Sequence, residues 1–166
     1  MSHVLPIVEQ MELARRYNQG LVDGVAAEDW FRQPSEGVSH VAWQVGHLAV
    51  AQFFLTMDRI RGRRDDDAKL LPDEFFRLFG KGSTPEPDPG NYPAVEEILA
   101  AFAGVHAQAV AELAELPESV LDEPVDKPHP AFSTKGGALR FCPLHEMLHA
   151  GQIGLLRRLL GNAPLR

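Results

Sequence analysis

Two histidines near the C-terminus have the spacing of a metal-binding pair. His145 and His149 are four residues apart in the segment HEMLHAGQI. On an α-helix this spacing separates two side chains by about 40° and one turn, so both imidazoles can reach one ion. The apolar residues Phe141, Leu148 and Leu156 lie on or beside the same predicted stripe. Because burying two charged imidazolium groups would be costly, this setting favours neutral imidazoles bound to a divalent cation.

A third ligand has to come from another segment, and His47 is the best candidate. It lies in the middle of a segment whose apolar residues predict a buried helix. His40 lies two turns earlier, and His106 shares a stripe with apolar residues of a later helix, so we expect both to be hydrogen-bonded core residues. His3 and His129 are expected near the terminus and in a loop.

The segment His145–His149 also matches the H-E-x-x-H pattern, in which the glutamate is the general base of a metalloprotease. The metzincin extension would require glycine at position 152 and histidine at position 155, where this chain has Gln152 and Leu155. No acidic residue follows Glu146 to act as a third ligand. We therefore expect Glu146 to be a surface or ion-paired residue, although an open metal site near a carboxylate still permits hydrolytic chemistry.

Several polar or aromatic residues near the histidines are candidates for supporting the ligands or lining a pocket. Gln152 lies one turn after His149 and could orient a ligand or a bound molecule, or be a hydrogen-bonded buried amide. Cys142 is close to the pair in sequence, but helical geometry turns it about 60° from His145, so a buried, inert thiol is expected. The full set of candidate pocket or supporting residues is Gln152, Trp43, Glu146 and His106.

Four segments with helical periodicity predict the scaffold for these residues. The first carries a stripe from Ile7 to Val25, and the second runs from a predicted N-cap at Ser39 to Arg61. The third follows Pro93 and is stopped by Pro117. The fourth runs from about residue 138 to 160, and either begins at Pro143 or is kinked there.

Two long connections, residues 63–92 and 117–137, separate these helices. Pro72–Phe79 predicts a short helix in the first, and Phe132 with its neighbours forms an extended piece at most, so no sheet is expected. Loops of this length in a compact domain are either functional or disordered. The prediction is an all-α protein, one domain over residues 1–166, built as a four-helix bundle with long connecting loops.

The composition excludes some classes of function. The formal net charge of −7 disfavours binding to nucleic acid, which would require a basic surface. The single cysteine makes a disulfide within the chain impossible and fits a reducing compartment. We expect no signal peptide and no apolar stretch approaching the roughly 20 residues of a membrane span, and therefore a cytoplasmic protein without membrane contact.

Two segments resemble the DinB-like superfamily: WxxGHL at Trp43–Leu48 and HxxxHxGQ at His145–Gln152. The resemblance covers nearly the whole chain and implies a four-helix bundle of DinB/YfiT-like topology, often dimeric. It also implies one divalent metal ion, commonly nickel or zinc, held by His47, His145 and His149. Manganese or iron are the alternatives. The related maleylpyruvate isomerases have glutamate where this chain has His145, so their activity is not implied.

Three functional hypotheses remain open at this point. The first, supported by the resemblance, is a metal-dependent transferase that acts with a low-molecular-weight thiol on a small molecule and forms a homodimer. The second is a non-catalytic, metal-stabilised stress-response or binding module, in which His106 or Glu146 would close the site as a fourth ligand. The third is a helical bundle with buried histidines and no metal.

Overall fold

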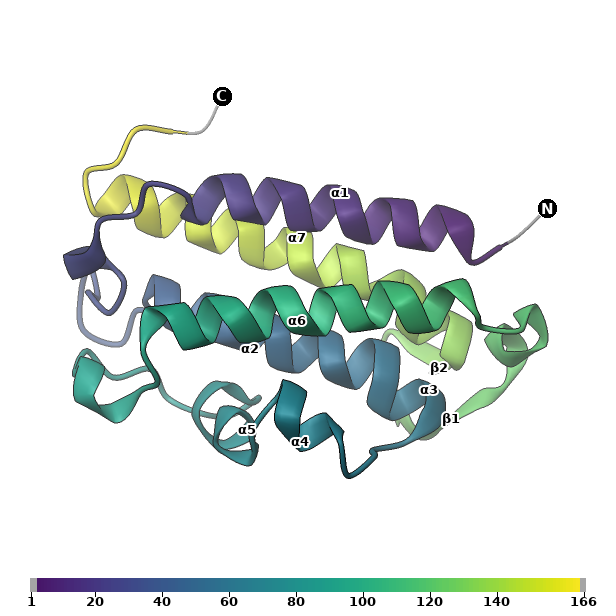
Figure 1. Cartoon of the computed structure of the whole chain (residues 1–166). Coiled ribbons are helices and arrows are strands. Elements are labelled where there is room, and N and C mark those ends of the chain that lie inside the picture. The colour runs from purple at the N-terminus through teal and green to yellow at the C-terminus, as the bar shows by residue number, and fades with distance from the viewer. Residues whose placement is uncertain (1–2, 165–166) are drawn as a thin grey trace.

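The computed structural model describes residues 3–164, and four long helices dominate it (Figure 1). Helices α1 and α7 lie side by side and begin at the same end of the molecule, and α2 and α6 form a second parallel pair that runs in the opposite direction (Figure 1). The predicted all-α class is confirmed at the level of a mostly helical chain. These helices are α1 (Leu5–Val22), α2 (Val41–Phe53), α6 (Val95–Ala114) and α7 (Lys135–Leu159).

Short elements fill the connections between the long helices. The predicted short helix is α5, and a hairpin of β1 and β2 in the last connection corrects the expectation that the chain has no sheet. The sequence does not predict these strands, because β1 begins with Pro124 and β2 is too short to show an alternating pattern. The short elements are η1 (Ala27–Asp29), α3 (Arg59–Arg61), α4 (Asp67–Leu70), α5 (Asp73–Phe79), η3 (Pro89–Asn91), η4 (Glu118–Asp122), β1 (Pro124–His129) and β2 (Phe132–Thr134).

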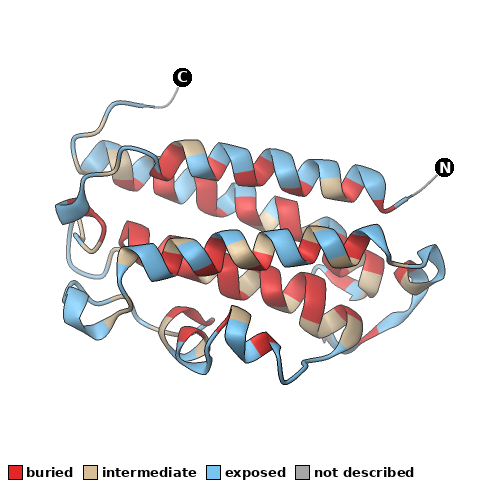
Figure 2. Cartoon of the chain, in the orientation of Figure 1, coloured by how far each residue is buried: buried red, intermediate tan, exposed pale blue. Residues whose placement is uncertain are grey.

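The core lies between the inward faces of the long helices, which are buried, while the outward faces are exposed (Figure 2). Helix α6 is long and apolar enough to meet the length and composition of a membrane span, which corrects the expectation that no stretch approaches that length. The helix packs against α2, and its buried residues recur mostly at a spacing of three or four, as in a core helix. They are Ile98, Ala101, Phe102, Val105, Ala109 and Leu113.

Two helix starts differ from the predicted ones. The N-cap of α2 is His40 rather than Ser39, because the His40 Nδ1 accepts a hydrogen bond from the backbone N–H of Trp43 at 3.1 Å. Helix α7 begins at Lys135, earlier than predicted, because the Thr134 hydroxyl accepts a hydrogen bond from the Gly137 N–H at 3.1 Å. It then continues through Pro143, so the proline marks neither its start nor its end.

One irregularity interrupts the second predicted helix. After Phe53 the chain forms a single π-helical stretch, η2 (Phe54–Asp58), before the short α3. A π-turn contains one residue more than an α-turn, so every residue after it is rotated relative to the face of α2. This rotation changes which side chains after residue 53 lie on the same side of the helix as His47.

Candidate metal centre

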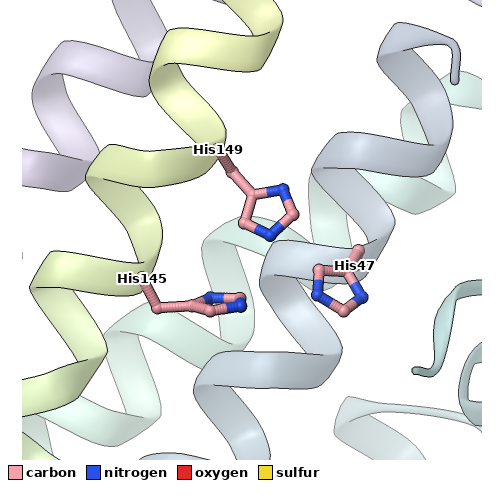
Figure 3. A group of neighbouring side chains, drawn as sticks. All are labelled: His47, His145 and His149. Carbon is pink, nitrogen blue, oxygen red and sulfur yellow. The ribbon is translucent and has the colours of Figure 1, made fainter. Parts of the chain in front are cut away.

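Three imidazoles from two helices converge on one point (Figure 3). His47 comes from α2, and His145 and His149 come from α7, which crosses it in the opposite direction. The nitrogen atoms that each residue can offer to an ion all lie within 4.8 Å of one another. The structure therefore brings together the three histidines that the sequence singles out as ligands.

His47 is held in place from both sides. Its Nδ1–H donates a hydrogen bond to the backbone oxygen of Phe79 at 2.7 Å, and the Trp43 indole stacks on its ring at 4.8 Å. The Trp43 Nε1–H in turn donates to the hydroxyl of Ser83 at 2.9 Å. With Nδ1 engaged, the Nε2 lone pair of His47 is left free to bind a cation.

Gly46 explains how Phe79 comes close enough to accept that hydrogen bond. A Cβ atom at this position would lie 2.5–2.7 Å from three ring atoms of Phe79, a separation that real Cβ atoms essentially never show. The missing side chain lets the end of α5 pack directly on α2. The Gly46–His47 pair therefore combines close helix packing with the orientation of the adjacent imidazole.

His149 is oriented by two glutamines. Its Nδ1–H donates to Gln44 Oε1 at 2.5 Å, and Gln44 Nε2 donates to Gln152 Oε1 at 3.0 Å. The sequence predicts Gln152 either to orient a ligand or a bound molecule or to be a buried amide; in the structure it is exposed and reaches His149 only through Gln44. Sequence reasoning missed Gln44, although it lies three residues before His47 and thus on the same face of the helix.

Burial keeps all three imidazoles uncharged near neutral pH. Desolvation is the main cause, and it lowers the pKa of His47, that of His145 to about 4 and that of His149 to about 3. The neighbouring histidines lower the pKa values of His145 and His149 further. A neutral imidazole is the form that binds a metal ion, so the donor set fits a divalent cation.

Glu146 does not take part in this site, which corrects its prediction as a pocket residue. Its carboxylate forms an ion pair with Arg15 of α1 at 2.8 Å, and both side chains are only 2% exposed. Arg15 also donates to Gln52 Oε1 at 2.6 Å and to the backbone oxygen of Phe102. Of the two settings predicted for Glu146, on the surface or in an ion pair, the structure shows the ion pair, and the pair is buried.

His106 belongs to the same buried cluster rather than to the metal site. Its Nδ1 lies 3.1 Å from the Gln52 amide nitrogen, and burial followed by the charge of Arg15 lowers its pKa to about 4. Cys142 also lies there, and burial raises the pKa of its thiol, in agreement with the expected inert cysteine. Within residues 3–164, no fourth histidine, cysteine or carboxylate joins the triad.

A cavity of about 540 Å³ lies beside the triad, and His47 and His145 form part of its wall. His129, expected in a loop, reaches this wall from the end of β1, where its ring stacks on Phe132 at 4.6 Å. The sequence around His129 has no alternating pattern that would indicate a strand, so neither the hairpin nor this position of His129 could be predicted. The complete lining is His47, Val50, Ala51, Phe54, Leu55, Arg59, Lys81, His129, Phe141 and His145.

Comparison with known proteins supports this organisation. Residues 10–153, which include the whole triad, match the model of the DinB superfamily. The chain is also similar to the crystal structure of a conserved protein from Enterococcus faecalis, with a TM-score of 0.76 and 18% identity over 98% of this chain and 99% of that one. At this identity the likeness shows the fold alone. A search of curated proteins finds no significant match.

Proposed function

The chain belongs to the DinB superfamily, and from this premise we propose that it is a four-helix bundle in which His47, His145 and His149 hold one divalent metal ion. The observation that carries this proposal is the convergence of three neutral imidazoles within 4.8 Å. The hydrogen bonds of His47 and His149 support it, because each engages Nδ1 and leaves Nε2 as the ligand atom. Imidazole donors suit nickel, zinc and iron better than manganese, which prefers oxygen ligands.

We further propose that the protein is a transferase that acts with a low-molecular-weight thiol. Three protein ligands leave a coordination position open, and the adjacent cavity gives a small molecule access to it. A metal ion bound there would lower the pKa of a thiol and supply a nucleophile near neutral pH. The chain itself contributes two imidazoles that hydrogen bonds hold in place, and the cavity next to them has a partly apolar wall.

A conjugation assay tests the transferase proposal. The nickel- or zinc-loaded protein is incubated with glutathione, or with mycothiol or bacillithiol, and with 1-chloro-2,4-dinitrobenzene. The thiol loses its proton to solvent, its sulfur forms a bond to the ring carbon, the carbon–chlorine bond breaks, and chloride leaves. We expect a metal-dependent rate that the His149→Ala variant lacks. A loaded protein that neither binds any of these thiols nor changes this rate contradicts the proposal and leaves a non-catalytic metal-binding module.

We also propose a homodimer formed through α1 and α7. Exposed apolar side chains at helical spacing run along the two adjacent helices, and monomers rarely leave such a surface uncovered. Leu148, expected beside the histidine stripe, is one of them and is 64% exposed. The others are Leu5, Leu13, Tyr17, Leu144, Met147, Leu155 and Leu159.

Sedimentation velocity tests the dimer. The parent chain is expected at twice the mass of one chain, Leu155→Lys at the mass of a monomer, and Ala103→Lys, a control on an exposed position of α6, at the mass of the parent. A monomeric parent at tens of micromolar contradicts the proposal.

A further inference from the structure

The cavity beside the triad is positively charged in a protein that is acidic overall. The chain has 23 acidic and 16 basic residues, yet the cavity wall contains Arg59 and Lys81 and no carboxylate. The histidines that complete its polar lining have lowered pKa values and are neutral. The cavity therefore offers two cationic groups with no compensating charge in its wall.

Arg59 lacks the partner that a partly buried arginine normally has. Among residues 3–164 no carboxylate forms an ion pair with it, and its Nε atom is buried without a hydrogen-bond partner. Its guanidinium lies over the Phe132 ring, 5.4 Å from the centroid. By contrast, Arg61, two residues later, forms ion pairs with both Asp67 and Glu112. A buried arginine donor without an acceptor is costly, and a bound anion would supply that acceptor.

The π-turn explains why an arginine lines the cavity. In an uninterrupted α-helix, positions 47, 51, 54 and 58 would share one face, so Asp58 would follow Phe54 on the wall. The extra residue of η2 rotates the chain, and Arg59 lines the cavity while Asp58 does not. A local departure from helical geometry thus replaces a negative group with a positive one next to the triad.

Lys81 and the apolar wall complete the arrangement. Lys81 follows Phe79, whose backbone oxygen holds His47, and it forms no ion pair within the described part of the chain. The positive charges of Arg59 and Lys81 both reach His129, whose pKa they lower in addition to its desolvation. Between these cations and the histidines, the wall is formed by Val50, Ala51, Phe54, Leu55 and Phe141.

We propose that this cavity binds an amphipathic carboxylic acid, with its carboxylate on Arg59 and Lys81 and its apolar body along Phe54 and Phe141. The planar guanidinium of Arg59 matches a carboxylate, and the aromatic wall matches a hydrocarbon or aryl group of the size that a cavity of about 540 Å³ accommodates. The inference deepens the proposed function, on which it rests for the role of the ligand: the acid is the acceptor substrate, and its other end faces the triad. Binding of the carboxylate itself requires no metal.

Calorimetric titration of the full chain tests the proposal with 4-phenylbutyrate as the probe and 4-phenylbutanamide as its neutral counterpart. We expect the metal-free and the zinc-loaded protein to bind the acid at least tenfold more tightly than the amide. Arg59→Gln is expected to remove this preference, and Lys81→Gln to reduce it several-fold. Arg16→Gln, which removes an exposed cation of α1, is the matched control and is expected to bind like the parent.

The outcomes separate the proposals. Equal affinity for acid and amide, an Arg59→Gln variant that binds like the parent, or no binding to the folded parent would overturn the carboxylate site. Inorganic phosphate that binds as tightly as the acid would also overturn it, because the apolar wall would then contribute nothing. A triad that fails to hold metal while the acid still binds in an Arg59-dependent manner would defeat the proposed function, and with it the role of the acid as acceptor substrate, but would leave the carboxylate site intact.

Discussion

Helix α7 contributes to two polar clusters that lie in different directions, and they satisfy their charges in opposite ways. On one side, Glu146 is fully engaged by Arg15 in a buried ion pair. On the other, the adjacent His145 and His149 direct neutral nitrogen atoms toward the same point as His47. No other histidine, cysteine or carboxylate of residues 3–164 joins them there. The first cluster is closed within the chain, and in the proposed function a cation from outside would complete the second.

This contrast gives each part of the HEMLH segment a different role. Consecutive helical residues point about 100° apart, and Glu146 contacts Arg15 of α1 while His145 faces His47 of α2. The glutamate that would act as the base in a protease is committed to joining α7 to α1. Stability and metal binding should therefore respond to different substitutions, although the residues are neighbours in sequence.

The largest effect on stability is expected from Glu146→Ala. Removing the carboxylate leaves the Arg15 guanidinium buried without its counter-charge, which should cost about 3–5 kcal/mol of unfolding free energy. Urea denaturation of the metal-free protein measures this loss. The double variant Arg15→Met/Glu146→Leu is the control and should recover most of it, because both charges are removed together. If folded Glu146→Ala protein no longer binds metal, the two clusters are not independent.

Acidification is expected to weaken the closed cluster through His106. Its folded-state pKa of about 4 lies below the unfolded value of about 6.5, so the unfolded chain takes up the proton first. The stability contribution is complete above pH 6.5 and is lost as the pH falls toward 4, by at most about 3 kcal/mol, reduced by solvent screening at the partly exposed ring.

Urea denaturation of the metal-free protein at several pH values between 7 and 4 measures this dependence. His106→Gln keeps a hydrogen-bonding group next to Gln52 but does not titrate, so its stability should fall less steeply than that of the parent. Identical slopes for the two proteins would show that the proton uptake lies elsewhere.

A smaller effect is expected from Gln44→Ala in the open cluster. Without the acceptor for its Nδ1–H, His149 loses its fixed orientation, and metal affinity should fall about 10–100-fold. Competition with a chromophoric chelator measures the affinity. Gln52→Ala is the matched control, because Gln52 serves the Arg15 cluster and its loss should reduce stability but not metal affinity. If Gln52→Ala lowered metal affinity and Gln44→Ala did not, the two clusters would not have the separate roles assigned to them.

Much of the scaffold could be predicted from the sequence because it follows helical periodicity. The spacing of His145 and His149 predicts their shared face, and the apolar setting of His47 predicts that it points inward. Side chains whose direction depends on a regular helix are the ones that periodicity can place. Leu148, predicted on or beside the histidine stripe, is exposed, because a position next to a buried helix face can still point to solvent.

The rest of the site could not be predicted, because it depends on irregular backbone and long-range contacts. Arg59 lines the cavity only through the π-turn, and His129 reaches it only through the hairpin. The pairing of Glu146 with Arg15 joins residues 131 positions apart, and no local pattern announces it. The Gln44–Gln152 bond likewise requires knowledge of which faces of α2 and α7 meet.

Metal content is the most direct test of the central claim that His47, His145 and His149 hold one divalent ion. The chain, purified without a histidine tag, is measured by mass spectrometry beside the three single alanine variants of these residues. The account predicts close to one metal ion per chain in the parent and its loss in each folded variant. A parent that contains no metal and cannot be loaded with nickel, zinc or manganese would contradict the account.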